Sequence, residues 1–247
     1  MLDQWVIAIA AFAAGVLNAM AGGGSFLTFP ALVYIGIPPV AANATSAVAV
    51  FPGYLSSTLG FIEEIRAFDR RLLWRLVALS CVGGIAGAVL LLYTPGELFR
   101  GLAPWLLLFA TRLFALGDKI SARVSSKSAS PNSSSQMLAV LAVSTYGGYF
   151  NGGLGIILLA LLSTMGLRDL NLMNGLKNGL SFLLSAVSVA TFALAGIVHW
   201  PEAFLMMITA TLGGYVGARL ARRIPAIWIR RLVVLVGATM AVLFFTL

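Results

Sequence analysis

The stretch from Asn18 to Ser46 sets the strongest limit on how this chain can fold, because it is apolar and yet repeatedly interrupted. An apolar run breaks at the consecutive glycines Gly22 to Gly24, resumes, and breaks again at Pro38 and Pro39. Interrupted helices leave backbone N–H and C=O groups that lipid cannot satisfy. Such breaks survive in a membrane where protein or a polar cavity covers them, and they commonly line a substrate site.

The composition indicates an integral membrane protein. Of the 247 residues, 60% are hydrophobic and 10% are charged, whereas a soluble domain carries about 25% charged residues. The formal charge of +8 does not indicate nucleic-acid binding, because the basic residues cluster in short segments between apolar runs, where they orient a membrane protein. The single cysteine, Cys81, excludes an intrachain disulfide.

Long apolar segments follow one another along the chain, and a full helical crossing of a bilayer needs about 20 residues. They lie at 4–21, 25–37, 40–62, 72–93, 98–116, 136–165, 170–198, 202–221 and 226–247. Segment 25–37 is too short to cross alone, so we expect half of a broken or re-entrant element. Residues 117–135 are rich in Ser with scattered Lys and Arg, which predicts a flexible cytoplasmic linker.

The two sides of this linker match at a constant offset of 130 residues, which indicates an internal repeat. The block Gly83-Gly84-Ile85-Ala86-Gly87-Ala88 falls on Gly213-Gly214-Tyr215-Val216-Gly217-Ala218, while Gly22, Gly23 and Gly36 fall on Gly152, Gly153 and Gly166. We therefore expect a first membrane repeat at 1–116 and a second at 136–247. The spacing of small residues within the block is typical of close helix packing.

The distribution of arginine predicts that the two repeats are inverted. The charged loop Glu63–Arg71 holds three Arg and its counterpart 193–201 has no Lys or Arg, whereas 94–100 holds one Arg and its counterpart 219–231 holds five. Because cytoplasmic loops are rich in Lys and Arg, the halves would have opposite orientations, with both termini outside. The predicted fold is an all-α polytopic membrane protein with an inverted repeat and broken or re-entrant helices near the midplane, as in alternating-access transporters.

The two glycine breaks supply the candidate substrate-binding residues. A helix that restarts after a break presents free N–H groups and the positive end of its dipole, which favour an anion. The first-half candidates are Asn18, Gly22, Gly23, Gly24, Ser25, Thr45 and Ser46, and the second-half candidates are Asn151, Gly152, Gly153, Lys177 and Asn178. The alternatives are helix capping for the polar residues and close helix packing for the glycines.

Lys177 is the candidate with the most specific chemistry, because an ionisable side chain inside an apolar segment is costly and commonly functional. Beside helix N-termini it would make a cavity anion-selective; the alternative is that it extends to the membrane interface. No Asp or Glu lies deep inside an apolar segment, which leaves no obvious proton relay or sodium site. Without an HExxH, a GxSxG, a P-loop or a metal-ligand cluster, we predict no enzyme, no cofactor and no metal.

These motifs resemble the TauE/SafE family, also called the sulfite exporter or 4-toluene sulfonate uptake permease family. The likeness rests on NAMAGGGSFLTFPALVYIGIPPVAANATS and, in the second half, on Asn151-Gly152-Gly153 and Leu176-Lys177-Asn178. It implies a multi-pass carrier of the bacterial inner membrane that exports sulfite, sulfoacetate or related sulfonates. Members often carry Gly-Thr-Asn-Lys after the double proline, where this chain has Ala44-Thr45-Ser46-Ala47, so Lys177 would be the sole cation of the site.

Two functions remain open from the sequence. The first is a secondary transporter that binds a small sulfur-containing anion between the two breaks and exports it by alternating access. The second is an anion channel or passive pore on the same scaffold. In either case the partners are the small anion and the lipid bilayer, with no nucleic acid, and the sequence leaves a homodimer open.

Overall fold

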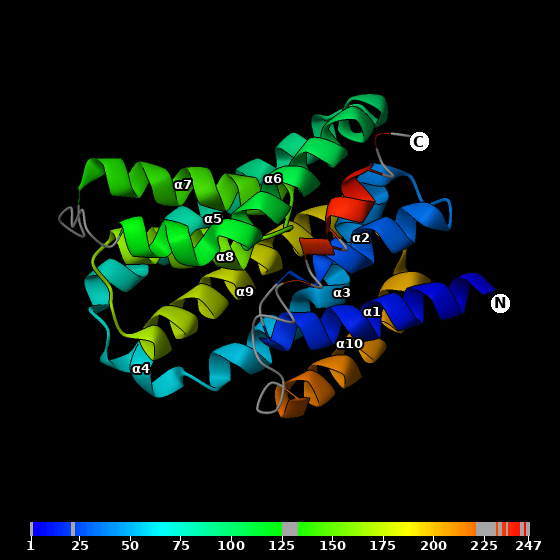
Figure 1. The fold of residues 1–247 in the computed structure, drawn as a ribbon. Helices are drawn as coiled ribbons and strands as arrows, with labels where there is room; N and C mark the ends of the chain where they lie inside the picture. The colour runs from blue at the N-terminus through cyan, green and yellow to red at the C-terminus, as the bar shows by residue number, and fades with distance from the viewer. Residues whose placement is uncertain are drawn as a thin grey trace.

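A computed structural model describes residues 2–20, 23–124 and 133–220, together with residues 231, 234–235, 237–242 and 245. All regular elements in these residues are helices, which confirms the all-α prediction (Figure 1). They are α1 (Leu2–Met20), α2 (Ser25–Tyr34), α3 (Pro39–Leu59), α4 (Ile62–Ala67), α5 (Arg70–Tyr93), α6 (Gly96–Val124), α7 (Ser134–Tyr149), α8 (Leu154–Thr164), α9 (Leu170–Leu194) and α10 (Trp200–Leu220).

The helices are interrupted at both places where glycine clusters predicted a break. Gly23, shortly before α2, has a φ of 111°, and Gly153, directly before α8, has a φ of 73°. Glycine adopts such positive φ values far more readily than other residues. The 10 residues of α2 and the 11 of α8 rise about 1.5 Å each, so each helix is about half as long as the roughly 30 Å apolar core of a bilayer. Gly22 lies outside the described residues.

The order α1, α2, α3, α5 in the first half recurs as α7, α8, α9, α10 in the second, at the offset of 130 residues. The turns that follow α2 and α8 have the same backbone conformation and the same hydrogen bond. Gly36 after α2 and Gly166 after α8 have φ values of 91° and 83°. Ile37 N donates to Leu32 O at 3.1 Å, and Leu167 N donates to Leu162 O at 3.3 Å. The second half therefore repeats the local structure of the first.

Each half supplies one helix to each of two close helix pairs. α1 packs along α10, and α5 packs along α7 (Figure 1). A Cβ on Gly213 would lie 2.0 Å from Phe12 O, and a Cβ on Gly87 would lie 2.0 Å from Thr145 O, so these glycines let the backbones touch. The packing role that their spacing indicated is confirmed. Between the two pairs, α3 contacts α9, where the rings of Phe51 and Phe182 stack at 5.0 Å.

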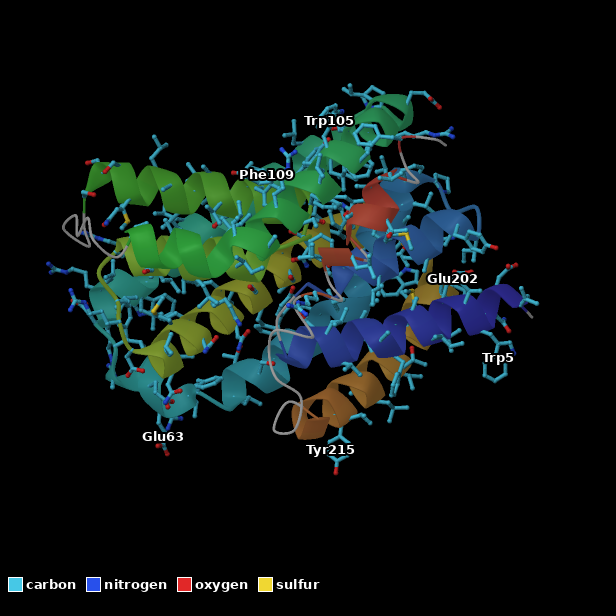
Figure 2. The ribbon with its side chains drawn as sticks, in the orientation of Figure 1. Trp5, Glu63, Trp105, Phe109, Glu202 and Tyr215 are labelled. Carbon is cyan, nitrogen blue, oxygen red and sulfur yellow. The ribbon has the colours of Figure 1, made fainter. Side chains whose placement is uncertain are left out.

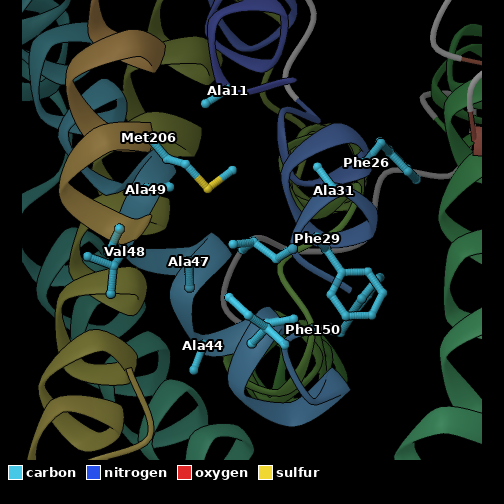
Figure 3. Packing of buried hydrophobic residues seen from close by; sticks show 14 of the residues in the cluster. Ala11, Phe26, Phe29, Ala31, Ala44, Ala47, Val48, Ala49, Phe150 and Met206 are labelled. Atoms are coloured by element: carbon cyan, nitrogen blue, oxygen red, sulfur yellow. The ribbon is translucent and has the colours of Figure 1, made fainter. Parts of the chain in front are cut away.

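The larger buried core lies around Phe29. Its ring meets those of Phe99 and Phe150 edge to face, with centroids 6.1 and 5.8 Å apart. Figure 3 shows Phe29 and Phe150 within this cluster. Trp5 and Tyr215 instead point away from the helices and are 70% and 60% exposed (Figure 2). Among the described helices, α5 and α9, with 24 and 25 residues, are long and apolar enough to cross a bilayer.

Two stretches differ from their sequence-based description. The charged loop Glu63–Arg71 contains the short helix α4, with Glu63 and Glu64 in its first turn and Arg66 in its last. Acidic residues at the start of a helix and basic residues at its end interact favourably with the helix dipole. α6 continues to Val124, so helix covers the first part of the stretch expected to be a linker, and residues 125–132 lie outside the described part.

Candidate functional site

Two tyrosines hold the second-half break between α7 and α8. The hydroxyl of Tyr146 donates to Gly152 O at 2.7 Å, and the hydroxyl of Tyr54 donates to Asn151 Oδ1 at 3.2 Å. Asn151, Gly152 and Gly153 are all buried. Buried polar groups are normally paired, and these bonds pair the side-chain oxygen of Asn151 and the carbonyl of Gly152. The break is thus an ordered, polar element inside the protein.

The two restarted helices leave backbone donors at equivalent positions. The N–H groups of Ser25 in α2 and Gly155 in α8 donate no hydrogen bond within the described part of the chain. The first N–H groups of a helix have no partner within the helix, and together with the helix dipole they form a ready site for an anion. Ser25 is 5% exposed, so its N–H lies in the protein interior.

The side chain of Lys177, which comes from α9, packs against the first turn of α8. A Cβ on Gly155 would be 3.5 Å from Cδ of Lys177, and Lys177 Nζ donates to Asn174 Oδ1 at 3.2 Å. No carboxylate pairs with this ammonium group among the described residues. Asn178, the next residue on α9, is 9% exposed. The aliphatic part of the Lys177 side chain therefore packs against the first turn of α8, while its ammonium group is hydrogen-bonded to Asn174 on α9.

The polar candidates on α3 already have internal partners. Thr45 Oγ1 accepts a hydrogen bond from His199 N at 3.1 Å, and Ser46 Oγ lies 2.6 Å from Thr28 Oγ1. Asn43 Nδ2 donates to Tyr149 O at 2.9 Å, at the end of α7. These are tertiary contacts and not caps at the start of α3, and they connect α3 with α2, with the end of α7 and with the segment before α10.

Asn18 lies apart from Lys177. It lines a cavity of about 460 Å³ between α1, α3 and α10. The cavity is lined by Ala14, Gly15, Asn18, Ala49, Val50, Pro52, Gly53, Ser57, Ala210, Thr211, Gly214 and Tyr215. In the second half the positions equivalent to Gly53 and Ser57 are Leu183 and Val187, whose larger side chains occupy more space. The open space near the first break therefore follows from small residues on α3.

The structure brings some of the candidates together and not others. Asn151, Gly152 and Gly153 form the break before α8, and Lys177 lies against the start of that helix. Gly23, Gly24 and Ser25 form the start of α2, and Asn18 lines the separate cavity. Sequence reasoning missed Tyr54 and Tyr146, because an aromatic residue in an apolar helix gives no sign of the loop it will reach.

Comparison with known proteins identifies the family to which the chain belongs. Residues 7–244 match the family model described as sulfite exporter TauE/SafE. The chain belongs to the TauE/SafE family. The TauE/SafE protein is 30% identical over 244 residues to the probable membrane transporter protein YfcA of Escherichia coli K12, covering 96% of this chain and 87% of the relative. It is 28% identical over 233 residues to a probable membrane transporter protein of Haemophilus influenzae, covering 93% and 89%.

The family assignment confirms the resemblance seen in the sequence. The TauE/SafE protein is a multi-pass, all-α membrane protein and a transporter, not an enzyme. Its apolar outer residues, such as Trp5 and Tyr215 (Figure 2), are then the side chains that face lipid or the membrane interface.

Proposed function

We propose that this TauE/SafE protein is a secondary transporter that exports small sulfur-containing anions, such as sulfite, sulfoacetate or related sulfonates, across the bacterial inner membrane by alternating access. The observation that carries the proposal is the position of Lys177. Its side chain lies against the first turn of α8, beside an N–H that has no partner in the described structure. A positive charge and a helix N-terminus both favour a negatively charged solute.

The anion would be bound by three kinds of donor. The ammonium group of Lys177 supplies charge, the N–H of Gly155 supplies a fixed backbone donor, and the side-chain amide of Asn178 can add a further hydrogen bond. Hydrogen bonds to an ionised acceptor are shorter and stronger than neutral ones. These donors suit sulfite and sulfonate groups, which present several oxygens on one sulfur.

Alternating access is supported by the helix contacts between the two halves. α1 of the first half packs on α10 of the second, and α7 of the second half packs on α5 of the first, so both close helix pairs join the two repeats. Small residues line both the α1–α10 and the α5–α7 interfaces. Surfaces without large side chains suit helices that slide past one another as rigid bodies. In an inverted repeat, such movement opens a central site to one side and then to the other.

The membrane potential would drive export without a coupling ion. No Asp or Glu lies deep in an apolar segment of the sequence, so no carboxylate is available there to carry a proton or bind sodium. An inside-negative potential moves an anion outward with about 2.3 kcal/mol per charge per 100 mV. This is sufficient to make outward movement the favoured direction. The bacterial relatives support the inner membrane as the location.

Flux measurements in proteoliposomes test this function. The purified protein is reconstituted, and uptake of radiolabelled sulfite and sulfoacetate is measured with and without unlabelled anion on the opposite side. A transporter gives saturable uptake that unlabelled anion on the far side accelerates. Unsaturable flux with single-channel current would instead favour the anion pore. If neither anion moves, the proposed substrate class is wrong.

A further inference from the structure

A strip of polar residues runs along one side of α9. Its members are Asn174, Lys177, Asn178, Ser181, Ser185 and Ser188. With 3.6 residues per helical turn, these positions fall within an arc of about 100° on the helix surface. The strip begins at the Lys177 position beside α8 and continues for several turns toward the C-terminal end of α9.

Two hydroxyls in the middle of this strip have no hydrogen-bond partner among the residues that the structure describes. Ser181 is 0% exposed and Ser185 is 1% exposed, and the Oγ atoms of both lack a partner within the described residues. Other buried serines nearby are paired: Ser144 Oγ donates to Ser80 Oγ at 3.3 Å, and Ser188 Oγ donates to Gly84 O at 3.5 Å. Burying an unpaired hydroxyl is unfavourable, so two on one helix face require an explanation.

The first half lacks most of this strip. The positions of α3 that correspond to Asn174, Lys177, Asn178, Ser181 and Ser185 are Ala44, Ala47, Val48, Phe51 and Leu55, and only the last strip position, Ser188, has a polar counterpart, Thr58. Ala44, Ala47 and Val48 are buried in the larger core, where Figure 3 shows Ala44 and Ala47 near Phe150. The two central helices, α3 and α9, are therefore unequal, because α3 is apolar at five of the six positions where α9 carries a donor.

We propose that Ser181 and Ser185 form a second oxyanion subsite on α9, about one to two helical turns beyond Lys177. The subsite rests on the proposed function and extends it, because it takes the oxygens of the same transported anion. Residues at i and i+4 are neighbours on a helix face, about 5–6 Å apart between Cβ atoms. Each hydroxyl can donate one hydrogen bond, so the pair can hold two oxygens of one sulfite or sulfonate group.

In this arrangement the two repeats contribute unequally to anion binding. The polar contacts of the anion come from the second repeat alone, with Lys177 at one position and the serine pair at the next. The proposed subsite explains why the hydroxyls of Ser181 and Ser185 are buried without a protein partner, because the substrate supplies the missing hydrogen-bond acceptor.

Substitution of the serine pair tests the subsite in the reconstituted full-length protein. The variant Ser181→Ala/Ser185→Ala is compared with wild type and with the control Ser188→Ala, which has the same helix, strip and burial but a hydroxyl with a partner. Saturable sulfite uptake and the thermal melting temperature in detergent without sulfite are measured for each. We expect about a tenfold higher half-saturation concentration for the double variant and a change of less than twofold for Ser188→Ala.

The melting temperature separates binding from folding. Removal of unpaired hydroxyls should leave the melting temperature of the double variant unchanged or raise it, whereas Ser188→Ala loses a hydrogen bond and should melt at or below the wild-type temperature. A half-saturation concentration within twofold of wild type overturns the subsite, and so does a lowered melting temperature, which would show that the hydroxyls support the fold. Absence of sulfite uptake by wild type itself instead refutes the proposed function.

Discussion

The hydroxyl of Tyr54 donates a hydrogen bond of 3.2 Å to Asn151 Oδ1, although the two residues are 97 positions apart in the chain. This bond connects α3 of the first half with the break before α8 of the second. Asn43, also on α3, donates to Tyr149 O at the other side of the same break. One helix of the first half therefore holds the element of the second half on which the proposed anion site is built.

Loss of the Tyr54 hydroxyl should destabilise the protein. Tyr54→Phe keeps the ring and leaves the buried Asn151 oxygen without a donor, which costs about 1–3 kcal/mol. The measurement is thermal unfolding of the purified protein in detergent. Tyr93→Phe is the control, because Tyr93 is 83% exposed, and its effect should stay within about 0.5 kcal/mol. Equal melting of both variants and wild type would contradict the role of this bond.

The glycines of the two helix pairs should respond alike to an added methyl group. A Cβ on Gly83 would lie 2.8 Å from Leu141 O, and one on Gly213 would lie 2.0 Å from Phe12 O. Gly83→Ala and Gly213→Ala should each destabilise the protein by about 1–3 kcal/mol, because backbone must move. Gly101→Ala in α6, where nothing lies within 4 Å, should be neutral or stabilising. Unchanged melting of the first two variants would show that close approach of these helices is not needed.

The sequence predicted the interrupted helices because glycine clusters inside apolar runs allow few alternatives. Three consecutive glycines from Gly22, and Gly152 with Gly153, mark the breaks, and the offset of 130 residues revealed the matching helix order. The close packing at Gly83 and Gly213 also followed from spacing alone. These features depend on local backbone geometry, which neighbouring residues determine.

The partners of the polar residues could not be predicted in the same way. The hydroxyl of Thr45, a candidate for substrate binding, accepts a hydrogen bond from His199 N, 154 residues away in the chain. Which residues meet at such separations depends on how helices pack. The sequence analysis did not single out the polar strip on α9, although the spacing of Ser181, Ser185 and Ser188 places them on one helix face. An isolated serine in an apolar helix commonly bonds to its own backbone, so the spacing alone does not indicate a site.

Positive φ at Gly153 should matter for transport as well as for stability. An alanine there meets a cost of about 1–2 kcal/mol for the left-handed conformation and shifts the start of α8. Gly166 is the matched control, because its φ is 83° and nothing lies within 4 Å of a Cβ there. Both Gly153→Ala and Gly166→Ala should lower the melting temperature. Anion uptake per folded molecule should fall in Gly153→Ala alone, and equal uptake in the two variants would count against a role for the break in binding.

Lys177 gives the most direct test of the claim that a positive charge beside the start of α8 binds the transported anion. The measurement is saturable uptake of radiolabelled sulfite in proteoliposomes that contain wild type, Lys177→Met or Lys177→Arg. Because a hydrogen bond to a charged group contributes about 1.5–3 kcal/mol, the account predicts that Lys177→Met lowers uptake at limiting sulfite about ten- to hundredfold. Lys177→Arg, which keeps the charge, should retain more uptake than Lys177→Met. Uptake by Lys177→Met equal to that of wild type would contradict the account.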